Sequence, residues 1–444
     1  MLHLNEHSPI ISKGARQTKI AIIGAGISGL GCAYALAPHY DVTLYEARSR
    51  LGGHSRTLMA GRNEQYPVDT GFMVFNDRNY PNLNALFDEL DIPSVASNMS
   101  FGVSIDDGKF EYGLHEVNRM FADPINALRP SFWRMIKDIL KFNKHGHIYK
   151  SDPNITLGQA LSKMGLSETF KRNYLCPLAG AIWSTSPEDM MDFPAQTLVQ
   201  FFENHGLMST KGSPQWYTPE GGSKIYVERM AKFLRGHGAT IFTDMPVLGV
   251  ERSKPKTTVL TSAHPPATYD KVIFACHSDQ ALRLLAKPTK QEKSLLGALR
   301  YKKNTVILHD DPSQMPVRRA CWSSWVYKGY SDNPNENSFT YWMNSLQHIP
   351  NSTPVFVTLN PKIPIRDEFI FNTTTLAHPQ FDLPALKAKE ELPSIQGLNN
   401  TWYCGAYARY GFHEDGLTSG LNVAHHLHEQ SKSEHDLDKE EAFA

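Results

Sequence analysis

Three glycines and one acidic residue near the start of the chain carry the clearest chemical signal. Gly24, Gly26 and Gly29 follow the apolar run of residues 19–23 in the spacing G-x-G-x-x-G. This spacing allows a tight turn, brings backbone N–H groups close to a pyrophosphate, and lets the following helix pack against the strand. Glu46 ends a second apolar run seventeen residues after Gly29, where its carboxylate can accept both hydroxyls of a ribose. The four residues predict an adenine dinucleotide site, and the acidic side chain would repel the 2′-phosphate of NADP.

A second glycine pair, Gly52 and Gly53, makes this prediction more specific. The pair lies between two arginines in the segment RLGGHSRT, residues 50–57. An acid followed by Arg, Gly-Gly and a basic residue resembles the first motif of the flavin amine oxidase and phytoene desaturase superfamily. The resemblance implies that the dinucleotide is FAD. No cysteine stands in the context through which some amine oxidases attach flavin, so we expect FAD to be bound non-covalently.

Three further segments extend the resemblance to nearly the whole chain. They are residues 67–72, residues 218–247 with a glycine pair that opens a helix, and residues 402–420. In the superfamily the last of these begins a helix whose N-terminus faces the flavin, where the helix dipole stabilises negative charge. The resemblance implies that FAD is bound by Gly24, Gly26, Ser28, Gly29, Glu46, Ala47, Arg48, Gly52, Gly53, His54, Ser55, Arg56, Thr70, Gly71, Phe72, Val247, Ala275, Gly405, His413, Glu414, Asp415 and Gly416.

His413 is also the candidate catalytic residue. In amine oxidases an aromatic side chain near this place forms one wall of the substrate cage, and here the position matches Phe412 or His413. An imidazole with its ordinary pKa near 6.5 could move a proton as hydride leaves the substrate. A role limited to hydrogen bonding with FAD or with the backbone fits the sequence equally well.

A lysine that holds a water molecule beside the flavin in amine oxidases would match Lys302 or Lys303. Neighbouring side chains of a strand face opposite ways, so at most one of the two lysines points inward. A surface position for both is the simpler interpretation. Without this lysine and a clear aromatic pair, ordinary amine oxidation is in doubt.

The order of the motifs predicts an α/β fold with two interleaved domains. A discontinuous, Rossmann-type FAD-binding domain of the GR2 kind is expected from residues 18–75, 212–285 and 395–430. A mixed-sheet substrate domain with a helical cap is expected from residues 76–211 and 286–394. Residues 1–17 and 431–444 are expected to form flexible termini. Expected helices cover residues 81–90, 131–144 and 156–164, and expected strands cover residues 269–275, 305–309, 339–342 and 354–359.

Composition excludes some classes of protein. The 444 residues carry 45 basic and 45 acidic side chains, a balance that argues against nucleic-acid binding by phosphate neutralisation. No apolar run approaches the roughly 20 residues that span a bilayer, and the first seventeen residues lack the apolar core of a secretory signal. The five cysteines stand singly, without metal-binding spacing. We therefore expect a cytoplasmic protein with reduced thiols and no metal site.

Several segments rich in aromatic and small residues are candidates for the wall of a substrate pocket. Aromatic residues usually fill cores, but their number here favours an apolar ligand. The candidate segments are residues 175–184, 201–205, 321–327 and 341–343.

Within the superfamily the chain most resembles bacterial amine-oxidase-like proteins, described as predicted NAD/FAD-binding proteins, that are encoded near cyclopropane-fatty-acid synthases. Residues 69–76, 341–344 and 404–416 carry this resemblance. It implies a lipid substrate, an unsaturated or methylated fatty acyl chain that is desaturated or isomerised by hydride transfer to flavin N5. Peripheral contact with the inner membrane face and a methyltransferase partner are expectations of the same kind.

Three other functions stay open at this point. The first is a flavin-containing amine oxidase that uses O2. The second is a non-catalytic FAD- and lipid-binding partner of a fatty-acid methyltransferase. The third is an isoprenoid desaturase, which the Gly-Gly-His form of the first motif suggests.

Overall fold

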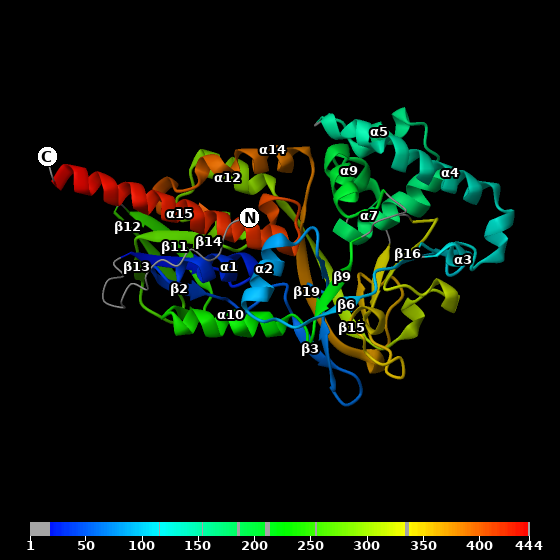
Figure 1. Ribbon diagram of the computed structural model, residues 1–444, viewed down its shortest axis with the longest axis horizontal. Helices are drawn as coiled ribbons and strands as arrows, with labels where there is room; N and C mark the ends of the chain where they lie inside the picture. The colour runs from blue at the N-terminus through cyan, green and yellow to red at the C-terminus, as the bar shows by residue number, and fades with distance from the viewer. Residues whose placement is uncertain are drawn as a thin grey trace.

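The chain builds two halves that lie along the long axis of the molecule (Figure 1). The computed structural model describes residues 18–442 except 115, 153, 184–186, 209–213, 254 and 334–336, with side chains up to residue 431. The predicted flexible arm, residues 1–17, lies outside the described residues. The side chains of the predicted C-terminal tail beyond residue 431 lie outside them too.

A parallel five-stranded sheet forms the centre of one half. The strand order is β10-β2-β1-β14-β20, with all neighbours parallel. β1 and β14 are buried on both faces, which explains why they read as short continuous apolar runs. The strands are β1 (Lys19–Ile23), β2 (Asp41–Tyr45), β10 (Thr240–Phe242), β14 (Lys271–Phe274) and β20 (Thr401–Tyr403).

Helices α1 (Ile27–Leu36), α10 (Lys224–Gly236) and α15 (His413–Ala442) pack together in this half. α1 and α15 approach so closely that a Cβ atom on Gly420 would lie 2.2 Å from the carbonyl oxygen of Ser28. Glycine is therefore required where the first and last helices of the half cross. The helix α2 (Pro81–Glu89) adds its apolar face to the same core.

The other face of the parallel sheet is covered by α11 (Ser278–Leu284), α12 (Lys290–Ala298) and α14 (Leu383–Glu391). Apolar side chains of α12 and α14 share one core with Val272 of β14. This differs from the sequence-based boundaries, which placed both helices in the substrate domain. The apolar side chains of the two helices pack against each other and against the parallel sheet of the first half.

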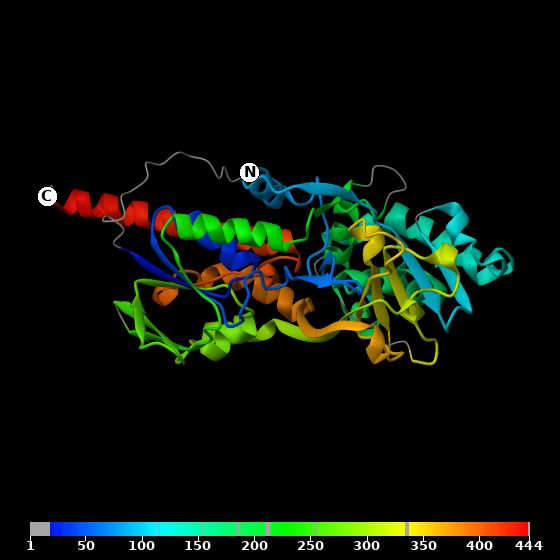
Figure 2. The same cartoon turned by 90° about the horizontal axis from the view of Figure 1, so that it is seen from below.

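A mixed seven-stranded sheet, in the order β19-β15-β18-β17-β16-β7-β8, forms the second half. Figure 2 shows β15 and β19 running out of the first half into this sheet. The strands are β7 (Phe101–Ile105), β8 (Phe110–Gly113), β15 (Arg300–His309), β16 (Trp325–Gly329), β17 (Ser338–Trp342), β18 (Phe356–Leu359) and β19 (Ile370–Gln380).

A group of helices caps the second half. They are α3 (Val117–Met120), α4 (Pro130–His145), α5 (Leu157–Lys163), α6 (Glu168–Phe170), α7 (Cys176–Trp183), α8 (Pro187–Met191) and α9 (Ala195–Asn204), with α13 (Met343–Leu346) beside the sheet. Among the helices that the structure describes, none is both long enough and apolar enough to cross a membrane.

Smaller strands connect these layers. A hairpin is formed by β3 (Thr57–Ala60) and β4 (Tyr66–Asp69), and three strands pair in the order β5-β9-β6. These three are β5 (Phe75–Asn76), β6 (Ser94–Ser97) and β9 (Trp216–Pro219). A further antiparallel sheet contains β11 (Val247–Ser253), β12 (Lys256–Thr261) and β13 (Ala267–Tyr269).

The predicted α/β fold is confirmed. The expected helices at residues 81–90, 131–144 and 156–164 match α2, α4 and α5, and the expected strands in the second half match β15, β17 and β18. The strand expected over residues 269–275 is divided between β13, which ends at Tyr269, and β14, which begins at Lys271.

Candidate active site

A continuous cavity of about 1640 Å³ connects the glycine turn after β1 with the mixed sheet and the helical cap. Ligand pockets usually measure about 300–1,000 Å³, so this cavity is large enough for a dinucleotide and a second molecule. Its wall includes residues from β1, β2, α7, α9, β15 and β19. The site therefore lies where the two halves meet.

The backbone around Gly24 and Gly26 leaves room for a ligand at one end of the cavity. Gly24 has a φ of +106°, and its N–H donates to the carbonyl oxygen of Tyr45 at 2.8 Å. A Cβ atom on Gly26 would have Gly53 Cα, at 4.0 Å, as its nearest neighbour. The two glycine segments thus pack backbone against backbone, with the Gly52 N–H donating to the carbonyl oxygen of Ala25 at 2.8 Å, and both line the cavity where a pyrophosphate would bind.

The carboxylate of Glu46 is held at this turn by two backbone donors. It accepts a hydrogen bond from Ala25 N–H at 2.9 Å and another from Arg48 N–H at 3.0 Å. Each oxygen keeps further acceptor capacity, because a carboxylate can accept about four hydrogen bonds. Glu46 also lines the cavity, so it can accept ribose hydroxyls as predicted.

Several buried polar atoms on the described cavity wall have no hydrogen-bond partner within the protein. Near the glycine turn and β20 they include His54 Nε2 and the hydroxyl of Tyr407, and elsewhere on the wall they include Asn143 Oδ1, Asp279 Oδ1 and Trp325 Nε1. In addition, α1 begins without a side-chain cap, which leaves N–H groups of its first turn for a ligand. Buried polar groups are nearly always paired in folded proteins, so His54 Nε2 and the Tyr407 hydroxyl fit a polar cofactor that completes the site.

His413 lies on the cavity wall at the first position of α15. Its Nε2 is 2.7 Å from the Tyr226 hydroxyl, which also bonds Ser55 Oγ, and its ring stacks on Phe72 at a centroid distance of 3.9 Å. Burial lowers the pKa of His413 to about 3 and raises the pKa of Tyr226. Both groups are therefore neutral at pH 7, and the imidazole is held in one orientation.

Comparison with known families agrees with this geometry. Residues 27–308 match the family described as flavin containing amine oxidoreductase. The chain belongs to this family of FAD-dependent oxidoreductases. FAD is therefore the cofactor, and the glycine turn and Glu46 are the residues predicted to hold it.

Individual relatives in this family are distant. Prenylcysteine oxidase 1 of Rattus norvegicus is 24% identical over 313 residues, which are 62% of this chain and 57% of that protein, so the chain spans little more than half of the rat relative. A CLA-producing fatty acid isomerase from P. acnes has a TM-score of 0.67 at 14% identity and covers 92% of this chain and 98% of its own. Cyclohexylamine oxidase from Brevibacterium oxydans IH-35A has a TM-score of 0.66 at 15% identity and covers 94% of this chain and 99% of its own. These two structures show the shared fold.

Most of the residues predicted to bind FAD line the cavity. They are Gly24, Gly26, Ser28, Glu46, Ala47, Arg48, Gly52, Gly53, His54, Gly71, Phe72, Val247, Ala275, Gly405 and His413. Their common position follows from the parallel sheet, since the carboxyl ends of β1 and β2 meet at the same edge.

The remaining predicted residues are not among those that line the cavity. Glu414 accepts backbone N–H groups of Asn82 and Leu83 and thereby caps α2, while Asp415 accepts the N–H groups of Tyr410 and Phe412. These contacts position the wall, and direct contact with FAD stays a prediction. The predicted residues outside the wall are Gly29, Ser55, Arg56, Thr70, Glu414, Asp415 and Gly416.

The substrate-wall candidates divide between the cavity and the core. Tyr341 and Trp325 line the cavity, whereas Tyr327 and Phe202 belong to the hydrophobic core, and Ser184 lies outside the described residues. Other lining residues from these segments are Leu178, Ala181, Ile182, Trp183, Phe201 and His205. Of the two lysines, Lys303 lines the cavity and remains exposed, whereas Lys302 is not part of its wall.

Sequence reasoning missed Tyr226, His277 and His378. Tyr226 is fully buried on α10, and its place four residues after Gly222 was the only local signal. The ring centroids of His378 and His277 lie 5.4 Å and 6.2 Å from that of His54. These three histidines form an uncharged polar group beside the cofactor end of the cavity, because burial lowers the pKa of each.

Acidification is expected to destabilise the protein. Burial lowers the pKa of six histidines, so the unfolded chain takes up protons below pH 6.5 while the folded chain does not. Each such histidine removes up to about 1.4 kcal/mol of unfolding free energy per pH unit between 6.5 and its folded pKa. The pKa of His205, His309 and His378 falls to about 4 and that of His413 to about 3, and the set also includes His54 and His277.

Four carboxyls have the opposite effect on the free energy of unfolding, because their raised pKa values let the folded chain take up protons on acidification. Burial raises the pKa of Asp69 to about 6, and it also raises the pKa of Asp310, Glu414 and Asp415. The histidines outnumber these carboxyls, so urea unfolding should give a lower free energy at pH 5 than at pH 7, with FAD bound or removed. A free energy that rises on acidification would contradict the burial of neutral imidazoles.

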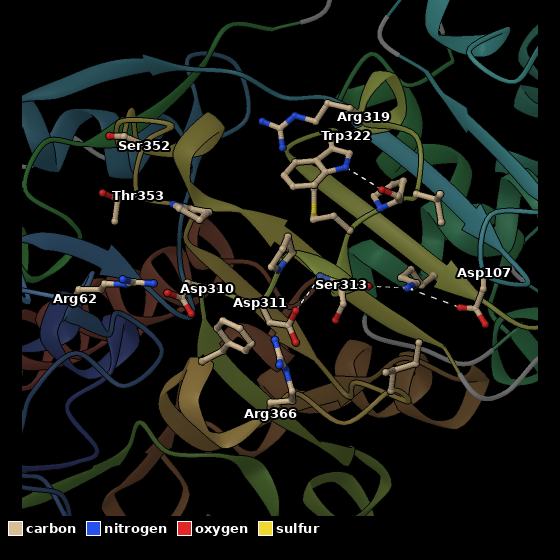
Figure 3. Close-up of a pocket in the computed structure, with 18 of the residues that line it drawn as sticks. Arg62, Asp107, Asp310, Asp311, Ser313, Arg319, Trp322, Ser352, Thr353 and Arg366 are labelled. Carbon is tan, nitrogen blue, oxygen red and sulfur yellow. Dashed lines mark hydrogen bonds and ion pairs between the residues drawn. The ribbon is translucent and has the colours of Figure 1, made fainter.

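A second cleft, of about 1100 Å³, opens beside β15 and the ends of β7 and β18, away from the glycine turn. Figure 3 shows Arg62 beside Asp310 and Arg366 beside Asp311, with Arg319 next to Trp322 and Asp107 farther away. Asp311 accepts the N–H of Ser313 at 2.9 Å, and Lys328 donates to the carbonyl oxygen of Ser313 at 3.0 Å. Trp322, a predicted substrate-wall residue, lies in this cleft under the guanidinium of Arg319. Asp310 Oδ1 is buried here without a hydrogen-bond partner, and no residue predicted to bind FAD lies in this cleft.

Proposed function

We propose that the protein is an FAD-dependent oxidoreductase that desaturates or isomerises an unsaturated or methylated fatty acyl chain. The observation that carries the proposal is the apolar part of the cavity, which continues from His413 towards the helical cap. An acyl chain has no polar atoms along its length, so it needs a long apolar wall and no hydrogen-bond partners there. The wall is formed by Met99, Phe101, Leu114, Met120, Ile136, Ile139, Tyr174, Leu178 and Ile182.

The charges on the cavity wall support an uncharged reacting group. Among the lining residues that the structure describes, the carboxylates are Glu46 and Asp279, which accompany the cofactor residues, and Glu116 near the cap. An ammonium substrate beside His413 would find no carboxylate partner among these residues. The fold that the chain shares with a fatty acid isomerase is compatible with the proposed substrate.

Bound FAD would supply the two-electron redox chemistry of the reaction. The chain itself would exclude water from the apolar chamber and hold the acyl chain against the wall that contains His413 and Phe72. With a pKa of about 3, His413 is a weak base at pH 7, so its proposed proton transfer needs a direct test. His413→Gln should lower the turnover number about 100-fold if the imidazole carries the proton, and should change mainly KM if it only positions neighbours.

An amine oxidase is the second candidate, because an aromatic cluster lies next to His413. Phe412 stacks on Phe201 at a centroid distance of 4.7 Å, and Phe201 stacks on His205 at 3.7 Å. Aromatic faces attract cations, so this cluster could hold an amine. A non-catalytic role beside a fatty-acid methyltransferase is the third candidate, and it requires FAD without turnover.

One experiment separates the three candidates. The purified flavoprotein is mixed anaerobically with unsaturated or cyclopropane-containing fatty acids, and separately with a panel of amines. Flavin absorbance is followed together with the mass and the double-bond positions of the acyl chain. A changed acyl chain supports the proposal, also where the flavin ends oxidised, as in an isomerisation. Bleaching by amines alone would assign the protein to the amine oxidases, and neither change would favour the binding role.

A further inference from the structure

The exposed apolar side chains of the protein gather on the helical cap. Six of the eleven large apolar side chains that are exposed in the described part of the chain lie between residues 117 and 148. Soluble surfaces rarely expose large contiguous apolar patches without a partner. The six side chains, called the cap surface below, are Val117, Ile125, Leu128, Trp133, Leu140 and Ile148, with Leu128 the most exposed at 82%.

The local structure explains why these side chains point outward. In α4, Phe132, Met135 and Phe142 are buried in the core, so the helix presents Trp133 and Leu140 on its other side. The flanking short helices η1 (Pro124–Leu128) and η2 (Gly146–Ser151) contribute the remaining exposed residues with α3. In Figure 1, α3 and α4 lie at the end of the molecule opposite the C-terminal end of α15.

The same segment carries a positive charge surplus in a chain whose formal net charge is zero. Residues 116–151 contain seven Lys and Arg but three Asp and Glu, a net charge of plus four. Each of the three carboxylates lies within 4 Å of an arginine of the segment, at 3.8 Å for Glu116, 3.8 Å for Asp123 and 3.3 Å for Asp138. The surplus is therefore carried by lysines. Lys150 pairs with Glu203 outside the segment at 2.8 Å, whereas Lys137 and Lys144 are exposed on α4.

The cap surface is continuous with the cavity of the proposed active site. Val117 and Leu140 are exposed to solvent by 71% and 58%, and both also line the cavity. Ile136 and Ile139 extend the cavity wall inward from the same helix. An apolar molecule could thus pass from the cap surface into the chamber beside His413 along these apolar side chains, with Glu116 and Asn143 the polar residues that line the same end of the cavity.

We infer that the cap surface docks on an anionic phospholipid bilayer and admits an acyl chain to the cavity between α3 and α4. Apolar side chains surrounded by lysines, with a tryptophan among them, match the composition of segments that lie in a membrane interface. Lysines near an anionic surface each contribute about 1 kcal/mol of attraction, which favours acidic lipid headgroups as the partner. The entry of acyl substrate rests on the proposed function, whereas the docking itself does not.

Vesicle sedimentation of the FAD-loaded protein tests the docking. Wild type should bind vesicles of phosphatidylcholine mixed with phosphatidylglycerol more strongly than vesicles of phosphatidylcholine alone. The double variant Ile125→Asp, Leu128→Asp and the double variant Lys137→Glu, Lys144→Glu should each lower the partition coefficient by about tenfold or more. Leu248→Asp is the matched control, because Leu248 is 61% exposed on β11 in the other half and should leave binding unchanged.

The outcomes separate docking from catalysis. The docking inference would be overturned if the wild-type protein bound neither kind of vesicle, or if the cap variants bound vesicles as strongly as the wild type. A dimer that only the Ile125→Asp, Leu128→Asp variant disrupts, with no vesicle binding, would assign the surface to a second copy of the chain. Failure of the proposed function looks different: vesicles would bind, but neither vesicle lipid nor a short soluble unsaturated acid would react. If docking serves entry, the cap variants should react with the soluble acid like wild type and react poorly with vesicles.

Discussion

Gly26→Asp is expected to abolish FAD binding while leaving the apoprotein folded. Gly26 has a φ of −75° and a ψ of −176°, which any residue can adopt, and a Cβ atom there has only Gly53 Cα at 4.0 Å as a neighbour. The new carboxylate would lie at the cavity wall beside the second glycine segment and repel the pyrophosphate. We expect FAD affinity to fall by at least about 100-fold, which corresponds to about 2.8 kcal/mol. Flavin absorbance after desalting measures the loss, and thermal unfolding of the apoprotein measures the fold.

Two control variants show whether the effect is specific. Gly26→Ala adds a small uncharged group and should weaken FAD binding less than the aspartate does. Gly24→Ala should destabilise the apoprotein itself by about 2 kcal/mol, because Gly24 has a φ of +106° and its Cβ atom would lie 2.8 Å from the carbonyl oxygen of Ala275. Normal FAD content in Gly26→Asp would refute the cofactor assignment.

Ile182→Trp is expected to reduce turnover of long acyl chains by about 100-fold while FAD binding stays intact. Ile182 is half-buried on α7 and lines the apolar part of the cavity, so a larger side chain can extend into the cavity instead of into the core. Filling a pocket that must hold a long chain removes apolar contacts worth about 0.8 kcal/mol for each excluded methylene group. Stopped-flow measurement with a long-chain and a short-chain unsaturated acid reports the effect.

The chain-length dependence is the decisive part of this prediction. The short acid should react with Ile182→Trp nearly as fast as with wild type. Ile182→Ala, which widens the cavity at the same position, should leave the turnover of the long acid unchanged. An equal loss for both acids would indicate damage to the cofactor site. No loss for the long acid would place the acyl chain elsewhere.

The cofactor end of the site could be predicted from sequence because its signal is local. The turn at Gly24 and Gly26, the strands that flank it and the acid at Glu46 lie within one short segment, and each residue type has one physical reason for its place. The first strand, β1, covers the predicted residues 19–23. Local motifs of this kind do not depend on how the rest of the chain assembles.

The remaining features depend on contacts between distant segments. Glu414 caps α2 across 332 residues, and Tyr226 meets His413 across 187 residues, so neither pairing leaves a pattern in the local sequence. The same is true of Trp322 and Trp325, which are close in sequence but lie in different cavities. The packing of α12 and α14 against the parallel sheet could not be predicted either, because the sequence of a helix with an apolar face does not specify which sheet that face covers.

An anaerobic single-turnover reaction with an unsaturated fatty acid deuterated at its allylic carbons tests the central claim most directly. If the cavity brings an acyl chain and FAD together as proposed, the acyl product should lose or relocate deuterium, and the reaction should be slower than with the undeuterated acid. Filling the cavity with Ile182→Trp should abolish both effects. An acyl chain recovered with all its deuterium in place, from protein fully loaded with FAD, would contradict the account.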